Sequence, residues 1–137
     1  MSKSPKSLLE QLTFGKRARR VVADLIIELV ETCRDDVMPG TPLCEFFMYV
    51  LIGGKILMLH ERGREASASD LSRLTGIPRT TVQRKLRTML KLGAIERCGR
   101  RWIIVPSFFN TPLVIKGFRR RQVIVSHARE KIATTGN

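Results

Sequence analysis

The chain has 137 residues, 43% of them hydrophobic, which is enough apolar material for one compact core and excludes a wholly disordered chain. Its 25 Lys and Arg against 12 Asp and Glu give a formal net charge of +13, which favours a polyanionic partner, nucleic acid before an anionic membrane surface. The three cysteines lack metal-ligand spacing and no catalytic constellation is present, so we predict no metal site, no cofactor and no enzymatic activity.

The N-terminal part of the chain is predicted to be a short tail followed by a helix. Residues 1–7 are rich in Ser and Lys, which is typical of a mobile tail. From Leu8 to Cys33 the apolar residues recur at intervals of three and four, as they do on one face of an amphipathic helix. We assign residues 8–42 to an N-terminal helical segment that serves in dimerisation. The apolar stripe consists of Val21, Val22, Leu25, Ile26, Leu29, Val30 and Cys33.

The next helix is predicted to begin at Thr41 and Pro42, because a hydroxyl residue followed by proline is a common helix start. It extends to about Glu61 and is apolar nearly all round, which predicts a buried central helix. No run reaches the roughly 18–20 apolar residues of a membrane span, and the N-terminus lacks the apolar core of a secretory signal. We therefore expect a cytoplasmic protein without a membrane partner.

Two helices separated by a glycine turn are predicted next. Ser67, with Asp70 three residues later, forms a variant of the capping box and starts a short helix over 68–75. Gly76 allows a tight turn because it tolerates positive φ. A second helix covers 78–92, with proline at its start and glycine just past its end.

A β-hairpin and a last helix complete the predicted elements. Residues 94–97 and 102–105 are predicted strands, with 98–101 as the tip. The last helix begins after Thr111 and extends to about Ala133. Its apolar residues, interrupted at Arg121, are Val114, Phe118, Val125, Ala128 and Ile132.

The order of these elements predicts a mainly α fold with a small β-hairpin wing. We place a winged helix-turn-helix domain at 43–106, flanked by N- and C-terminal helices. Residues 107–137 are assigned to a C-terminal helix that serves in dimerisation.

The charge is divided along the chain. Residues 1–20 hold six basic and one acidic residue, residues 21–61 hold two basic and seven acidic, and residues 62–137 hold 17 basic and four acidic. A protein with one face on phosphate and another on a protein partner needs this separation.

The stretch 67–106 resembles the DNA-binding part of bacterial transcriptional regulators of the IclR and MarR types. The residues that carry the resemblance are TGIPRTTVQRKL at 75–86 and LGAIER at 92–97. In these families they form the turn, the recognition helix and the entry to the wing. The resemblance implies a winged helix-turn-helix regulator that binds double-stranded DNA as a homodimer. The sequence indicates no particular small-molecule effector.

The predicted recognition helix at 78–92 has two faces, given about 100° of rotation per residue. The face toward the core consists of Val82, Leu86, Met89 and Leu90. The outward face consists of Thr80, Arg84, Arg87 and Lys91, with Gln83 and Thr88 at its flanks. We predict that Thr80, Gln83 and Arg84 contact bases in the major groove, with Arg79 and Thr81 as alternatives. Arg87 on the same outward face is also expected to bind DNA.

A second group of residues is expected to position the protein on the DNA backbone. The N-terminal amides of the helix face phosphate, as do side chains of the preceding helix and the wing. The wing arginines also suit the minor groove. This group consists of Ser67, Ser69, Arg73, Arg100 and Arg101.

Two questions stay open at the level of sequence. The apolar faces of the flanking helices suit an intramolecular core or a dimer interface, and we favour the dimer. The run Arg119 to Arg121 suits a solvated face better than phosphate contacts. The favoured function is a repressor that blocks a promoter and associates with the bacterial nucleoid when bound. A plasmid or phage replication, partition or DNA-architecture factor is the alternative, and an RNA or protein interaction module is a weaker one.

Overall fold

The computed structural model describes residues 15–134 of the chain. The predicted tail at 1–7, and the start of the first helix at Leu8, lie outside the described residues. The elements are α2 (Lys16–Val37), α3 (Leu43–Glu61), α4 (Ala68–Thr75), α5 (Arg79–Leu92), β1 (Ile95–Cys98), β2 (Arg101–Ile104), α6 (Pro106–Phe109) and α7 (Pro112–Thr134).

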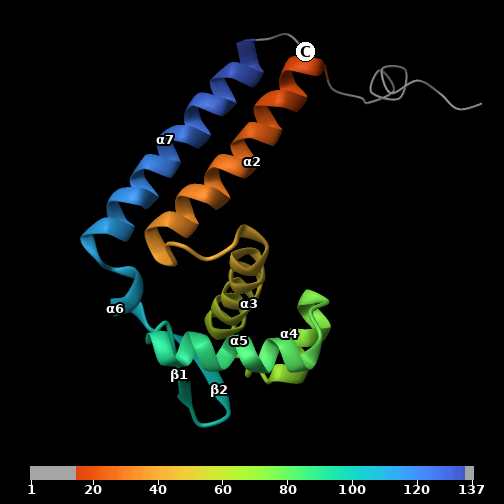
Figure 1. Ribbon diagram of the computed structural model, residues 1–137, viewed down its shortest axis with the longest axis vertical. Helices are drawn as coiled ribbons and strands as arrows, with labels where there is room; N and C mark the ends of the chain where they lie inside the picture. The colour runs from red at the N-terminus through yellow and green to blue at the C-terminus, as the bar shows by residue number, and fades with distance from the viewer. Residues whose placement is uncertain (1–14, 135–137) are drawn as a thin grey trace, which may run out of the picture.

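The predicted fold class is confirmed, since the chain is mostly helical and its antiparallel hairpin, β1 and β2, follows the helices. Helices α2 and α7, which are far apart in the sequence, lie side by side as a pair of long helices at one end of the molecule (Figure 1). Helices α3, α4 and α5 and the β-hairpin gather at the other end, and the short α6 connects the hairpin to α7 (Figure 1). The division into a domain at 43–106 and dimerisation segments at 8–42 and 107–137 stays a prediction.

The hydrophobic core lies in the winged end of the molecule. Ile52 and Ile56 of α3 are fully buried there, beside Leu71 of α4 and Val82 of α5. Ile95 closes the core from the hairpin. Because four elements share these contacts, α5 is held against the core by several neighbours at once.

Helix α3 is less buried than its sequence predicts. Only Phe46, Ile52 and Ile56 are buried, and a broad opposite face is exposed. The exposed large side chains of α3 are Leu43, Phe47, Val50, Leu51, Leu57 and Met58. The expectation of a fully buried central helix is therefore wrong. The apolar residues of α3 form two faces, one packed in the core and one exposed.

By length and composition alone, α3 could cross a membrane, and among the described residues no other helix could. The expectation that no run reaches this length is corrected. In the fold, however, its buried side packs on α4 and the hairpin.

The helix-turn-helix forms from local signals, as predicted. The Ser67 hydroxyl oxygen accepts a hydrogen bond from the Asp70 amide at 3.1 Å, and the Asp70 carboxylate accepts one from the Ser67 amide at 3.1 Å. This capping box begins α4. Gly76 ends it with a φ of 76°, a left-handed conformation that costs glycine little, and the chain turns directly into α5.

The β-hairpin has its predicted register, but its strands extend one residue further toward the turn. The strands pair Cys98 with Arg101 and Arg97 with Trp102, so Cys98 and Arg101 belong to strands. The turn is only Gly99 and Arg100, and Gly99 has a φ of 64°. The predicted four-residue tip is therefore wrong, because cross-strand pairing continues until a single glycine can reverse the chain.

The buried face of α7 also differs from the predicted stripe. Gly117 and Ala128 are buried, whereas Phe118, Val125 and Ile132 are exposed. The predicted stripe is confirmed for Ala128 and wrong for the three large residues, because α7 turns its small residues toward α2.

Arg121 interrupts the apolar pattern because it lies on the packed face of α7. It donates a hydrogen bond to Asp36 of α2 at 2.7 Å, and its side chain is only 13% exposed. Arg120 reaches the same carboxylate at 3.9 Å. The expectation of a solvated arginine face at 119–121 is therefore wrong for Arg121.

Candidate nucleic-acid interface

Helix α5 presents a buried face and a polar face, as its sequence predicts. Val82, Leu86 and Met89 are buried in the core. Leu90 is 45% exposed, so its assignment to the core is wrong. It lies beside the hairpin, where a groove leaves its side chain uncovered.

The outward face of α5 is polar and basic throughout. Its exposed side chains include Thr80, Gln83, Arg84, Arg87 and Lys91. Thr81 is half-buried. A helix with this surface is suited to a groove lined by phosphates and base edges.

The N-terminus of α5 has no side-chain cap. Pro78 occupies the N-cap position, and its side chain offers no hydrogen bond to the first-turn amides. Amides without a partner, together with the helix dipole, favour an anion at this end. Arg79 and Thr80 occupy the same exposed turn, so charge and hydrogen-bond donors coincide there.

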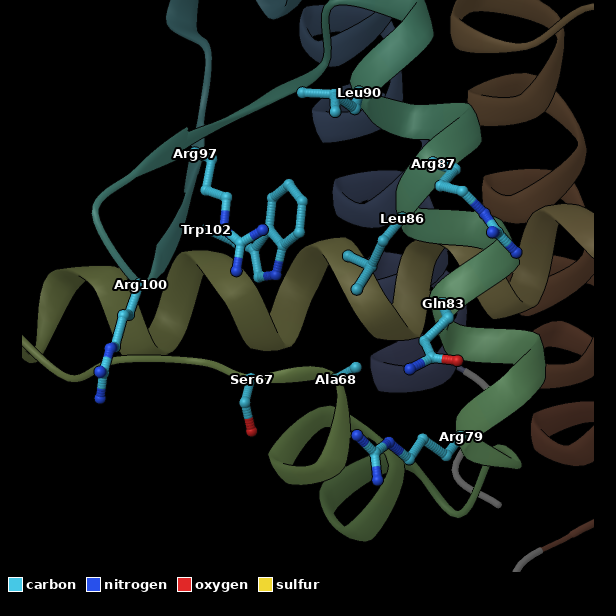
Figure 2. Close-up of a pocket in the computed structure, with 10 residues that line it drawn as sticks. All are labelled: Ser67, Ala68, Arg79, Gln83, Leu86, Arg87, Leu90, Arg97, Arg100 and Trp102. Carbon is cyan, nitrogen blue, oxygen red and sulfur yellow. The ribbon is translucent and has the colours of Figure 1, made fainter.

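A groove of about 690 Å³ separates α5 from the β-hairpin (Figure 2). Leu86 and Leu90 point from α5 toward the hairpin, and Trp102 points back toward them (Figure 2). The polar and charged residues around the groove are Ser67, Arg79, Gln83, Arg87, Arg97 and Arg100. Four arginines lie at the edges of its apolar floor, and no acidic residue lines it.

The groove brings together five of the eleven residues predicted from sequence, Ser67, Arg79, Gln83, Arg87 and Arg100. The other six, Ser69, Arg73, Thr80, Thr81, Arg84 and Arg101, do not line it. Whether any of the eleven contacts DNA stays a prediction.

Three of the predicted phosphate-binding residues have partners within the protein. The Ser67 hydroxyl donates to the Asp70 carboxylate at 2.8 Å, and this bond is the largest reason why the pKa of Asp70 lies below its ordinary value. Arg73 lies 3.5 Å from the same carboxylate, on a different hollow of the surface. Arg101 lies 3.9 Å from Glu65. These are exposed pairs, which solvent screens and DNA can displace.

Arg97 is a groove residue that sequence reasoning missed. Its guanidinium carbon lies 5.4 Å from the centroid of the Trp102 ring, so the indole face supports the cation. The signal was present in the sequence, because the predicted strands at 94–97 and 102–105 already place Arg97 opposite Trp102. Trp102 itself is half-buried and packs on the core, as expected of a residue that anchors the hairpin.

Lys85 is the second residue that sequence reasoning missed. It lies on the buried face of α5 and is only 2% exposed. Its position on the helical wheel, three residues after Val82, already places it within about 60° of the core direction. Its partner Glu45 is 40 residues away, and no local pattern predicts that contact.

Residues 55–99 match the family model described as the IclR helix-turn-helix domain. The match supports a DNA-binding domain of the kind found in transcriptional regulators, and the matched residues hold the helix-turn-helix and the first strand of the wing. The match takes in the end of α3, then α4, α5 and β1, and leaves α2 and α7 outside it. No curated protein and no solved structure matches the chain.

Proposed function

We propose that this IclR-type domain makes the protein a sequence-specific repressor, which inserts α5 into the major groove of double-stranded DNA and occupies a promoter. The hairpin then lies over the adjacent backbone or minor groove, with Arg100 in its turn. Such a protein acts in the cytoplasm, on the nucleoid.

The observation that carries the proposal is the polar face of α5 beside the basic groove. Gln83 and Arg87 belong to both surfaces, so one helix can contact base edges and phosphates together. Thr80 and Arg84 lie on the same outward face and complete the predicted base-contacting set.

We further propose that the protein is a homodimer. An apolar groove of about 560 Å³ runs between the end of α2, the exposed face of α3, and α6. Val50 and Leu57 of α3 line it and are each 45% exposed. Phe108 and Phe109 close the other side. Soluble monomers rarely expose continuous apolar patches of this kind, so a cover is required.

A second copy is the occupant that best suits this face. A stable dimer hides about 800 Å² per partner, which needs many exposed apolar side chains on adjoining elements. Helices α2, α3 and α7 all carry exposed apolar side chains, including Ile26, Val50 and Phe118. The groove lies at the opposite side of α5 from its polar face, because Met89 of the buried face lines it. Two copies joined there leave both recognition helices free for DNA.

The geometry of such a dimer sets the expected binding site. A twofold protein places its two recognition helices about one turn of DNA apart, roughly 34 Å. The preferred site is then a near-palindrome with half-sites about 10 base pairs apart.

Selection of bound duplexes from a random pool tests the proposal directly. We expect one recovered motif with twofold symmetry. A recovered pool without any motif would contradict sequence-specific binding. Recovery of the motif only as tandem repeats would instead favour a replication or partition factor over a repressor.

A further inference from the structure

Among residues 15–134, Lys85 is the only charged side chain that is fully buried. Its ammonium group donates a hydrogen bond to the Glu45 carboxylate of α3. The same nitrogen lies 4.4 Å from the centroid of the Tyr49 ring. Glu45 and Tyr49 are one helical turn apart, so α3 receives the lysine between a carboxylate and an aromatic face.

Packing alone does not account for a lysine at this position. The neighbours of Lys85 on the buried face, Val82, Leu86 and Met89, are apolar, and a methionine could fill the same space. Removing an ammonium group from water is unfavourable unless a partner replaces its hydration. Only the lysine of this ion pair is buried, since the Glu45 side chain is 40% exposed. Such a pair adds little net stability, but it is directional and selects one arrangement of two helices.

The partner of Lys85 also lies close to the DNA-facing side of α5. The pKa of Glu45 lies below its ordinary value, first because of the hydrogen bond from Lys85, then because of the Lys85 charge. The Arg84 charge adds to the same effect, although desolvation opposes it. The Glu45 carboxylate thus lies within electrostatic reach of the arginine that we expect to contact a base.

We propose that Lys85 is a positioning residue for DNA recognition. It contacts no DNA, but by binding Glu45 and Tyr49 it fixes the rotation of α5 on α3, and so the direction in which Gln83 and Arg84 project. This inference rests on the proposed function, because it needs a preferred duplex to recognise. It assigns sequence discrimination to a residue on the side of the helix that faces away from the nucleic acid.

The proposal makes a separable set of expectations. A residue that contacts phosphate changes the dependence of affinity on salt, whereas one that only supports the fold changes stability alone. A positioning residue changes the ratio between the affinities for the preferred and for a scrambled duplex. Only base contacts depend on the direction in which the side chains of α5 project. Salt dependence and specificity ratio therefore distinguish the three roles.

The experiment uses the full chain with Lys85→Met, Glu45→Gln and the double variant. Each is measured for thermal unfolding, and for affinity to the preferred and a scrambled duplex at several salt concentrations. We expect the specificity ratio to fall about tenfold in each single variant. The double variant should lose no more than either single one, because the two residues act as one unit. The salt slope should stay unchanged, and Lys85→Met should remain folded.

Three results would overturn the proposal. A specificity ratio within twofold of wild type in both single variants would show that the pair only supports the fold. A salt slope lower by about one in Lys85→Met would identify Lys85 as a phosphate contact. If Lys85→Met does not fold, Glu45→Gln decides alone, since it removes the charge and leaves the side chain nearly unchanged in size. Equal binding of wild type to all duplexes would overturn the proposed function, and this inference with it.

Discussion

Asp36 of α2 and Gly117 of α7 lie in direct contact: a Cβ atom added to Gly117 would come within 1.8 Å of the Asp36 Oδ2. That same oxygen accepts the hydrogen bond from Arg121. Both charged side chains are largely buried, with 10% and 13% exposed. The carboxylate therefore cannot move aside without loss of its partner, and glycine at 117 is what lets the two helices approach.

Gly117→Ala is expected to destabilise the α2–α7 pair. The added methyl group must displace the Asp36 carboxylate and break its bond to Arg121, at a cost of about 1–3 kcal/mol in the free energy of unfolding. Urea unfolding measures this loss. Ser126→Ala is the control, because it changes an exposed position of the same helix. It should change stability by less than about 0.5 kcal/mol, and equal effects from both variants would contradict the close contact.

Leu57→Glu is expected to convert the proposed dimer to a monomer. It places a charge in the apolar groove, where a second copy would have to desolvate it. Analytical ultracentrifugation measures the mass. Leu90→Glu is the matched control, since Leu90 has the same 45% exposure but lies on the DNA side of α5. It should weaken DNA binding and leave the mass unchanged. A monomeric wild type that binds lipid vesicles would assign the α3 face to a membrane.

Arg84→Ala is expected to relax specificity at one position of the site. The loss should be about 1–3 kcal/mol for the preferred base at that position and small for other sequences. Arg101→Ala should weaken binding to all duplexes alike, since its expected contact is phosphate. Competition binding with single-base variants of the preferred site measures both. Identical profiles for the two variants would contradict the division between base and phosphate contacts.

Arg97→Ala is expected to lower the slope of log affinity against log salt by about one, because it removes one cation from the groove between α5 and the wing. Affinity titrations at several salt concentrations give the slope. Arg129→Ala, which removes an exposed charge near the C-terminal end of α7, should leave the slope unchanged. If both variants lower the slope equally, the result would contradict the proposal that the groove arginines contact phosphate.

Stability is expected to fall as the pH drops below about 4. The pKa of Glu45 and that of Asp70 both lie below their ordinary values in the folded chain, because of hydrogen bonds from Lys85 and Ser67. A carboxyl with a lowered folded pKa stabilises the fold above its unfolded pKa, and this contribution is lost as the pH falls through the folded value. Thermal unfolding across pH 2 to 7 measures it, and Glu45→Gln with Asp70→Asn should flatten the curve. An unchanged curve in that double variant would exclude these two groups as its cause.

The parts of the fold that depend on neighbours in sequence could be predicted from it. The Ser67 cap, the left-handed Gly76 and the polar face of α5 all follow from residues within a few positions. The parts that depend on distant residues could not. Which side of α7 is buried depends on Asp36, which lies 85 residues before Arg121.

The same division applies to the candidate interface. Outward residues of α5 were found from helical periodicity, whereas Leu90 was misplaced, because its exposure depends on the groove beside the hairpin. Lys85 was overlooked, because only the fold shows that Glu45 and Tyr49 meet it. For a charged residue on the buried side of a helix, its position on the helical wheel is the only local sign that it is buried.

The most direct test of the central claim is the ratio of affinities for the selected duplex and a scrambled duplex of equal length, measured at one fixed salt concentration. A regulator that contacts bases through α5 should bind its selected duplex at least about 10³-fold more tightly. Equal affinity for the two duplexes would show that the basic face binds phosphate alone, and would contradict sequence-specific recognition.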